Sequence, residues 1–186
     1  MVGLRQLAAF LLLVLSPSTV WPEYFLGADY TRLGTNITFN DGSSLYTANP
    51  IRLRAGWRGE LAGIEVDFLS RQEQSQPAWG GDNYNFKTGA GFGAYLYLHQ
   101  KWVYAKLGGT WYDTTLTNLT SGISDNSTVA QATFAVGIEY ALFPNLFLNA
   151  DYTYAVGSTG YSTANPDQGS ADLTTQGGAI GITVGF

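Results

Sequence analysis

The chain has 186 residues, a length that fits one domain. Only 12% of the residues are charged, about half the share of a typical soluble domain, whereas 15% are aromatic and 23 are glycine. The net charge of −5 argues against nucleic acid as a partner, and the lack of cysteine excludes disulfide frameworks, thiolate metal sites and cysteine nucleophiles.

Residues 1–20 have the layout of a secretory signal peptide. Arg5 supplies a positive charge, and a run of nine apolar residues follows from Leu7. Because this run is too short to cross a membrane as a helix, we expect it to be removed by cleavage within 18–22. The mature domain is then expected over 21–186.

After residue 22, apolar and polar residues alternate with period two in eight segments, a pattern typical of β-strands with one buried face. In chain order the segments are 26–31, 51–58, 64–68, 91–98, 103–108, 132–140, 146–154 and 179–186. Eight such segments predict an all-β domain of eight antiparallel strands.

The connections between these segments alternate in length. Short turns and long polar stretches follow one another, the turns at 59–62, 99–100 and 143–145 and the long stretches at 36–49, 71–83, 113–127 and 158–171. Outer-membrane barrels have this pattern, with long loops outside the cell and short turns in the periplasm. The sequence therefore predicts an eight-stranded up-and-down transmembrane barrel with mobile outer loops and both termini on the periplasmic side.

Charge decides which face of the strands meets lipid. Five acidic and five basic residues fall on the polar face: Asp29, Arg52, Arg54, Arg58, Glu65, Asp67, Lys87, Lys106, Glu139 and Asp151. One arginine or lysine facing mid-bilayer costs about 2–4 kcal/mol, so several would exceed the roughly 5–15 kcal/mol stability of a fold. We therefore expect all ten inside the barrel, where opposite charges and water satisfy them.

The apolar face then contacts lipid. The sheet must close, because an open edge in hydrocarbon leaves backbone N–H and C=O groups unpaired. Eight strands enclose a lumen that side chains just fill. Amphipathic rings near strand ends are expected at the membrane–water interface: Trp57, Trp102, Trp111, Tyr140 and Tyr152.

Three segments resemble a known family. Residues 137–154 (GIEYALFPNLFLNADYTY) look like the penultimate hairpin of the small outer-membrane barrels of the OmpA, OmpX and opacity-protein type, and residues 27–30 and 181–186 are similar to that family too. The resemblance implies an interior charge network that blocks or gates the lumen. It also implies insertion by the outer-membrane assembly machinery, with an assembly signal formed by Ile180, Ile182, Val184 and Phe186.

The remaining reactive residues do not indicate catalysis. His99, the only histidine, falls in an expected periplasmic turn, on the side of the membrane opposite to the one where small lipid A enzymes act. Loop carboxylates such as Asp113 and Asp125 match no calcium-loop spacing. We expect a solvated His99 and no catalytic residue, cofactor or metal.

The favoured interpretation is a non-enzymatic, monomeric barrel of the bacterial outer membrane. It would contact membrane lipid and lipopolysaccharide and have a structural or surface-interaction role through its long loops. A narrow ion pore is the main alternative and needs a continuous water path through the charged interior. Two further alternatives are a lipid A-modifying enzyme and a secreted lipocalin, although a lipocalin has its apolar residues inside.

Overall fold

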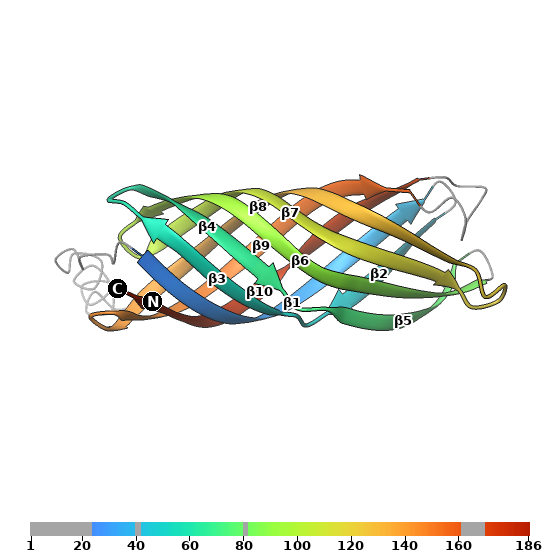
Figure 1. Ribbon diagram of the computed structural model, residues 1–186, viewed down its shortest axis with the longest axis horizontal. Coiled ribbons are helices and arrows are strands. Elements are labelled where there is room, and N and C mark those ends of the chain that lie inside the picture. The colour runs from blue at the N-terminus through green and yellow to red at the C-terminus, as the bar shows by residue number, and fades with distance from the viewer. Residues whose placement is uncertain (1–23, 40–41, 80–81, 161–169) are drawn as a thin grey trace, which may run out of the picture.

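The computed structural model describes residues 24–39, 42–79, 82–160 and 170–186. The expected signal peptide lies outside these residues. The described residues form ten β-strands (Figure 1): β1 (Tyr24–Phe39), β2 (Gly42–Ala48), β3 (Ile51–Arg58), β4 (Ala62–Leu69), β5 (Gln72–Trp79), β6 (Asp82–Gln100), β7 (Val103–Asn118), β8 (Ser124–Phe143), β9 (Leu146–Thr159) and β10 (Ala171–Gly185).

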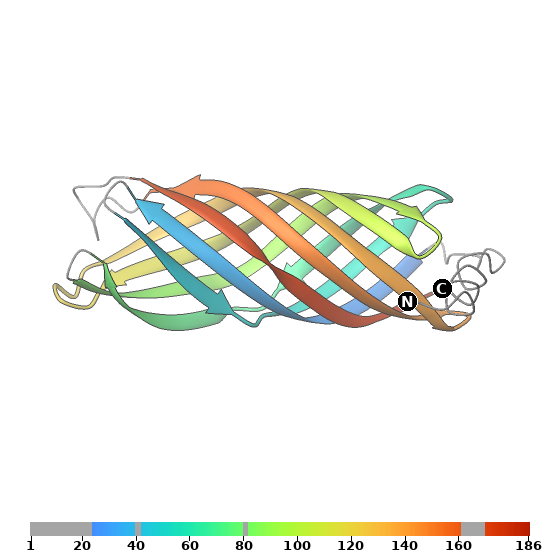
Figure 2. The same ribbon diagram turned by 180° about the vertical axis from the view of Figure 1, so that it is seen from behind.

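The strands form a closed, tilted cylinder, seen from opposite sides in Figures 1 and 2. Eight of them close a ring of antiparallel neighbours in the order β1, β3, β4, β6, β7, β8, β9, β10. Backbone hydrogen bonds of 3.2 and 3.0 Å between Tyr24 and Phe186 complete the closure. The predicted eight-stranded antiparallel barrel is therefore confirmed. We call the end with Tyr24 and Phe186 the terminal end, and the end where β7 turns into β8 the distal end.

The outer face of the terminal half is apolar. Along β7, Val103, Leu107 and Trp111 point outward and are exposed, and Asp113 follows on the same face. The run from Val103 to Trp111 has about the 9–11 residues that a tilted strand needs to cross a bilayer. This apolar belt surrounds the terminal half and gives the barrel a surface suited to lipid.

Paired strands replace most of the expected long loops. Within the stretch 36–49, β1 pairs with β2 as far as Phe39 and Gly42, and β7 pairs with β8 as far as Thr117 and Ser124. The expectation of loops there was wrong, because alternation continues but with polar residues on the outward face. The distal half is therefore largely a continuation of the cylinder beyond the apolar belt.

In the distal half, the strands that continue from β3 and β4 are no longer paired with each other. The β3–β4 ladder ends where the Ser70 amide donates to the Ile51 carbonyl at 3.0 Å. Pro50, the next residue toward the distal end, has no N–H to donate to β4. Its carbonyl accepts hydrogen bonds from the amide and the hydroxyl of Thr31 in β1, at 3.1 and 2.6 Å. Beyond this point no ladder joins β2 to β5 in the described chain, although each stays paired on its other side (Figure 1). We call this gap in pairing the seam.

Candidate functional site

Charged side chains fill the lumen of the terminal half. Nine of the ten residues expected there are buried, each at most 7% exposed: Asp29, Arg52, Arg54, Arg58, Glu65, Asp67, Lys106, Glu139 and Asp151. They project from β1, β3, β4, β7, β8 and β9. We call them the interior network.

Two arginines from β3 form its centre. Arg52 donates from Nε to Asp29 Oδ2 at 2.7 Å and from Nη2 to Asp151 Oδ2 at 2.5 Å. Arg54 Nε lies 2.8 Å from the same Asp29 oxygen, and Arg54 Nη1 donates to Glu65 Oε2 at 3.3 Å. Planar guanidinium groups suit this role because each can bind two carboxylates at once.

Lys106 connects two of these carboxylates. Its Nζ lies 2.6 Å from Glu65 Oε1 and 3.4 Å from Asp151 Oδ2, and the Tyr104 hydroxyl donates to the same Asp151 oxygen at 3.0 Å. The Tyr104 ring needs glycine at position 137, where a Cβ would lie 2.4 Å from it. Small and large inward residues thus complement one another across the lumen.

A separate ion pair closes the terminal end. Arg58 donates to both carboxylate oxygens of Glu139, at 2.5 and 3.1 Å. Its guanidinium lies 4.0 Å from the centre of the Phe25 ring and 4.7 Å from that of Tyr97. A bidentate pair packed between rings is a strong and geometrically specific arrangement, and it leaves this end of the lumen filled.

Lys87 does not belong to the interior network. A bulge in β6 between Thr88 and Gly91 shifts the alternation by one residue. As a result Phe86 is buried inside, and Lys87 lies on the outer face opposite Thr115. The expectation for Lys87 was wrong because it assumed unbroken alternation along this strand.

His99 is not a solvated turn residue. β6 continues to Gln100, and the chain turns at Lys101 and Trp102. His99 is 4% exposed, and its Nε2 donates to the Gly59 carbonyl at 2.7 Å. The imidazole therefore helps to fill the terminal end.

The expected interface aromatics lie on the outer face: Trp57, Trp102, Trp111, Tyr140 and Tyr152, each 36–55% exposed. Trp111 stacks on Phe92 with ring centres 5.3 Å apart at the distal edge of the apolar belt. The residues of the expected assembly signal also point outward from the end of the chain: Ile180, Ile182, Val184 and Phe186.

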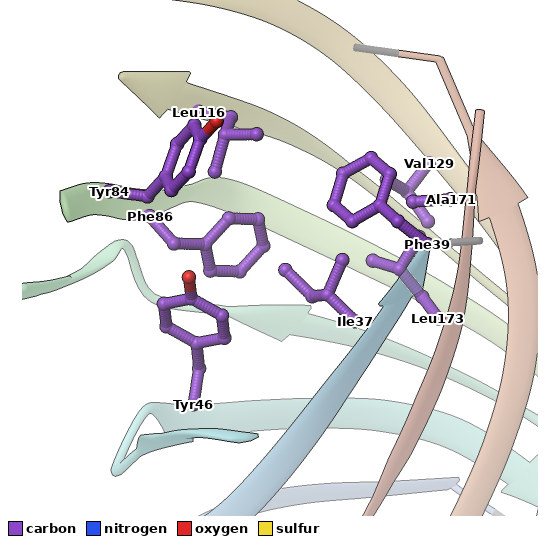
Figure 3. Close-up of a cluster of buried hydrophobic side chains, with 9 residues drawn as sticks. All are labelled: Ile37, Phe39, Tyr46, Tyr84, Phe86, Leu116, Val129, Ala171 and Leu173. Carbon is purple, nitrogen blue, oxygen red and sulfur yellow. The ribbon is translucent and has the colours of Figure 1, made fainter. Parts of the chain in front are cut away.

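An apolar cluster that the sequence analysis did not identify lies inside the distal half (Figure 3). We call it the distal plug, and it consists of Ile37, Phe39, Tyr46, Tyr84, Phe86, Leu116, Val129, Ala171 and Leu173. The rings of Tyr46 and Phe86 lie 4.9 Å apart, and burial raises the pKa of Tyr46 to about 12. Alternation such as that of Ile37 and Phe39 with polar neighbours could have revealed these inward positions.

The described residues contain neither a membrane-spanning helix nor a cluster of metal-binding side chains. No helix there is long and apolar enough to span a membrane. No group of three or more histidine, cysteine, aspartate or glutamate side chains there could hold a metal ion.

The model of a family described as "outer membrane protein beta-barrel domain" matches residues 8–186. Among solved structures, Neisserial surface protein A is 19% identical with a TM-score of 0.54, over 88% of this chain and 97% of that one. Ail, the attachment invasion locus protein of Yersinia pestis in complex with the heparin analogue sucrose octasulfate, is 13% identical with a TM-score of 0.52, over 87% and 99%. A search of curated proteins gave no match. At these identities the likeness shows the fold alone.

Proposed function

Since the chain belongs to the outer-membrane β-barrel family and thus to the bacterial outer membrane, we propose that it is a non-enzymatic barrel that interacts with other surfaces through its distal half. The observation that carries this proposal is the extension of paired strands beyond the apolar belt. Such hairpins present polar side chains on a rigid frame, whereas loops of the same length would have to be ordered on binding.

A narrow pore is less well supported by the interior. The interior network fills the terminal half, and the distal plug lies inside the other half. A permeating ion would have to separate buried ion pairs of 2.5–3.4 Å and then pass a cluster of apolar side chains. Both steps cost several kcal/mol, because the first separates buried ion pairs and the second moves a charge past apolar side chains.

The length of the turns supports one orientation. The connections at the terminal end are short, as at Pro144 and Asn145, and in bacterial barrels short turns face the periplasm. We therefore place the terminal end in the periplasm and the distal end outside the cell.

Labelling of single cysteines should report this orientation. The chain has no cysteine of its own, so Ser121→Cys at the exposed distal tip and Asn145→Cys at the exposed terminal turn each provide one reactive thiol. On intact cells, a membrane-impermeant maleimide is expected to label only the Ser121→Cys variant. Asn145→Cys should react after the outer membrane is permeabilised, and the opposite pattern would overturn the orientation.

Shortening one distal hairpin should remove the surface interaction without unfolding the barrel. Thr114 and Ser127 face each other in the β7–β8 ladder, so a two-residue turn can replace 115–126. Cells that express this variant are expected to adhere less to glass and cultured cells than cells with the full chain. Equal amounts of folded barrel, judged by heat-modifiable gel migration, are the control. Unchanged adherence at equal amounts would contradict a surface role for this hairpin.

A further inference from the structure

A cavity lies between the interior network and the distal plug. It has a volume of about 80 Å³, and we call it the waist cavity. Arg52, Asp67 and Tyr95 line its floor. Tyr112 lines it from above and packs against the distal plug. The cavity thus has charge on one side and an aromatic ring on the other.

Asp67 is a buried carboxylate with unused hydrogen-bonding capacity. It is 4% exposed, and within the described structure its Oδ1 has no hydrogen-bond partner. The other buried carboxylates of the interior network each have an ion pair: Asp29, Glu65, Glu139 and Asp151. Arg52 also reaches the cavity, but Asp29 and Asp151 already bind its guanidinium. Asp67 lines the cavity, and its Oδ1 remains as a hydrogen-bond acceptor without a partner.

The interior network has one more negative than positive side chain, and Asp67 is its carboxylate without an ion pair. Its nine members include five carboxylates but only four basic side chains. An uncompensated carboxylate inside a barrel surrounded by lipid is costly, so one additional positive charge beside Asp67 would be stabilising. One carboxylate is a poor site for a divalent metal ion, which needs several oxygen ligands, but it suits an ammonium group.

The cavity reaches the barrel wall on both sides of the seam. Ala48 and Pro50 line the cavity on one side of the seam, and Leu69 and Ser70 line it on the other. The interior network blocks the route from the terminal end, and the distal plug blocks the route from the distal end. The base of the seam lies next to outward-facing Phe68, at the distal edge of the apolar belt. A small amphipathic molecule that collects at a membrane interface would therefore meet this entrance.

We infer that the waist cavity binds a small primary ammonium ion with an apolar body, which enters through the seam. The ammonium group donates to Asp67 Oδ1, and the body lies against Tyr112 below the distal plug. A cavity needs a volume of about 10–15 Å³ to hold one water molecule, which has one non-hydrogen atom. A cavity of about 80 Å³ therefore suits a molecule of about five to eight non-hydrogen atoms. Benzylammonium has this size and chemistry.

Calorimetric titration of the folded, full-length barrel in neutral detergent micelles tests this inference. Benzylammonium is the probe, and benzyl alcohol is an uncharged ligand of the same shape. The variant Asp67→Asn removes the charge and keeps the size, whereas Asp113→Asn is the matched control, because Asp113 lies on the outer face and accepts a bond from Thr128 at 2.8 Å. Wild type and Asp113→Asn should bind benzylammonium equally, with at least tenfold weaker binding by Asp67→Asn and at least tenfold weaker binding of benzyl alcohol.

Each other outcome overturns part of the inference. Equal affinity in wild type and Asp67→Asn would remove the role of Asp67, and equal affinity for the two ligands would remove the requirement for an ammonium group. Absence of binding would refute the site. If Asp67→Asn does not fold, the variant Ala155→Leu decides, because it adds volume at a buried residue of the cavity wall and should abolish binding while Asp67 is kept. These outcomes do not depend on adherence or on the orientation in the membrane.

Discussion

Arg58→Ala is expected to lower the free energy of unfolding of the barrel by about 3–5 kcal/mol, because it leaves the Glu139 carboxylate buried without its partner. The substitution also removes the guanidinium that packs on Phe25. Since folded domains are stable by only about 5–15 kcal/mol, a loss of this size is a large part of the total.

Urea unfolding in lipid vesicles, followed by tryptophan fluorescence, measures this loss. The double variant Arg58→Met/Glu139→Gln removes both charges and keeps most of the volume, so it should cost clearly less than Arg58→Ala. Arg32→Ala, at an exposed position, should change stability by no more than about 0.5 kcal/mol. If the double variant is as unstable as Arg58→Ala, the unpaired charge is not the cause.

Leu107→Arg should destabilise the folded barrel by about 2–4 kcal/mol, since Leu107 lies in the middle of the apolar belt and is 62% exposed. Its new guanidinium would face hydrocarbon rather than the interior network. Thr117→Arg is the matched control on the same strand and the same outer face, beyond the belt, and should have little effect. The same unfolding assay compares the two, and similar losses would show that Leu107 does not face lipid.

The sequence was sufficient to predict the two faces of the terminal half. The free energy needed to move a charge into lipid is larger than the conformational preference of almost any single residue. The alternation of residues such as Arg54 and Leu53 is therefore strongly constrained there. The structure places these two residues inside and outside as the alternation requires. The individual ion pairs could not be predicted, because they depend on the stagger of neighbouring strands rather than on the pattern within one strand.

The distal half was harder to predict for a physical reason. Beyond the apolar belt the outward face of a hairpin is polar too, as at Thr115 and Thr117, so a strand there looks like a loop. The bulge between Thr88 and Gly91 is a backbone irregularity that alternation does not show, and it reversed the face of Lys87. The interior of this half, including the waist cavity and the seam, was missed for these reasons.

Closure between β1 and β10 has a consequence for biogenesis. Phe25 pairs with Gly185 and Asp29 pairs with Gly181. The β1–β10 ladder therefore joins residues from opposite ends of the domain sequence. Until β10 reaches β1, both strands present unpaired edges that favour aggregation. Pairing of β10 with β1 is therefore the step that removes the last two strand edges on which copies of the chain could associate.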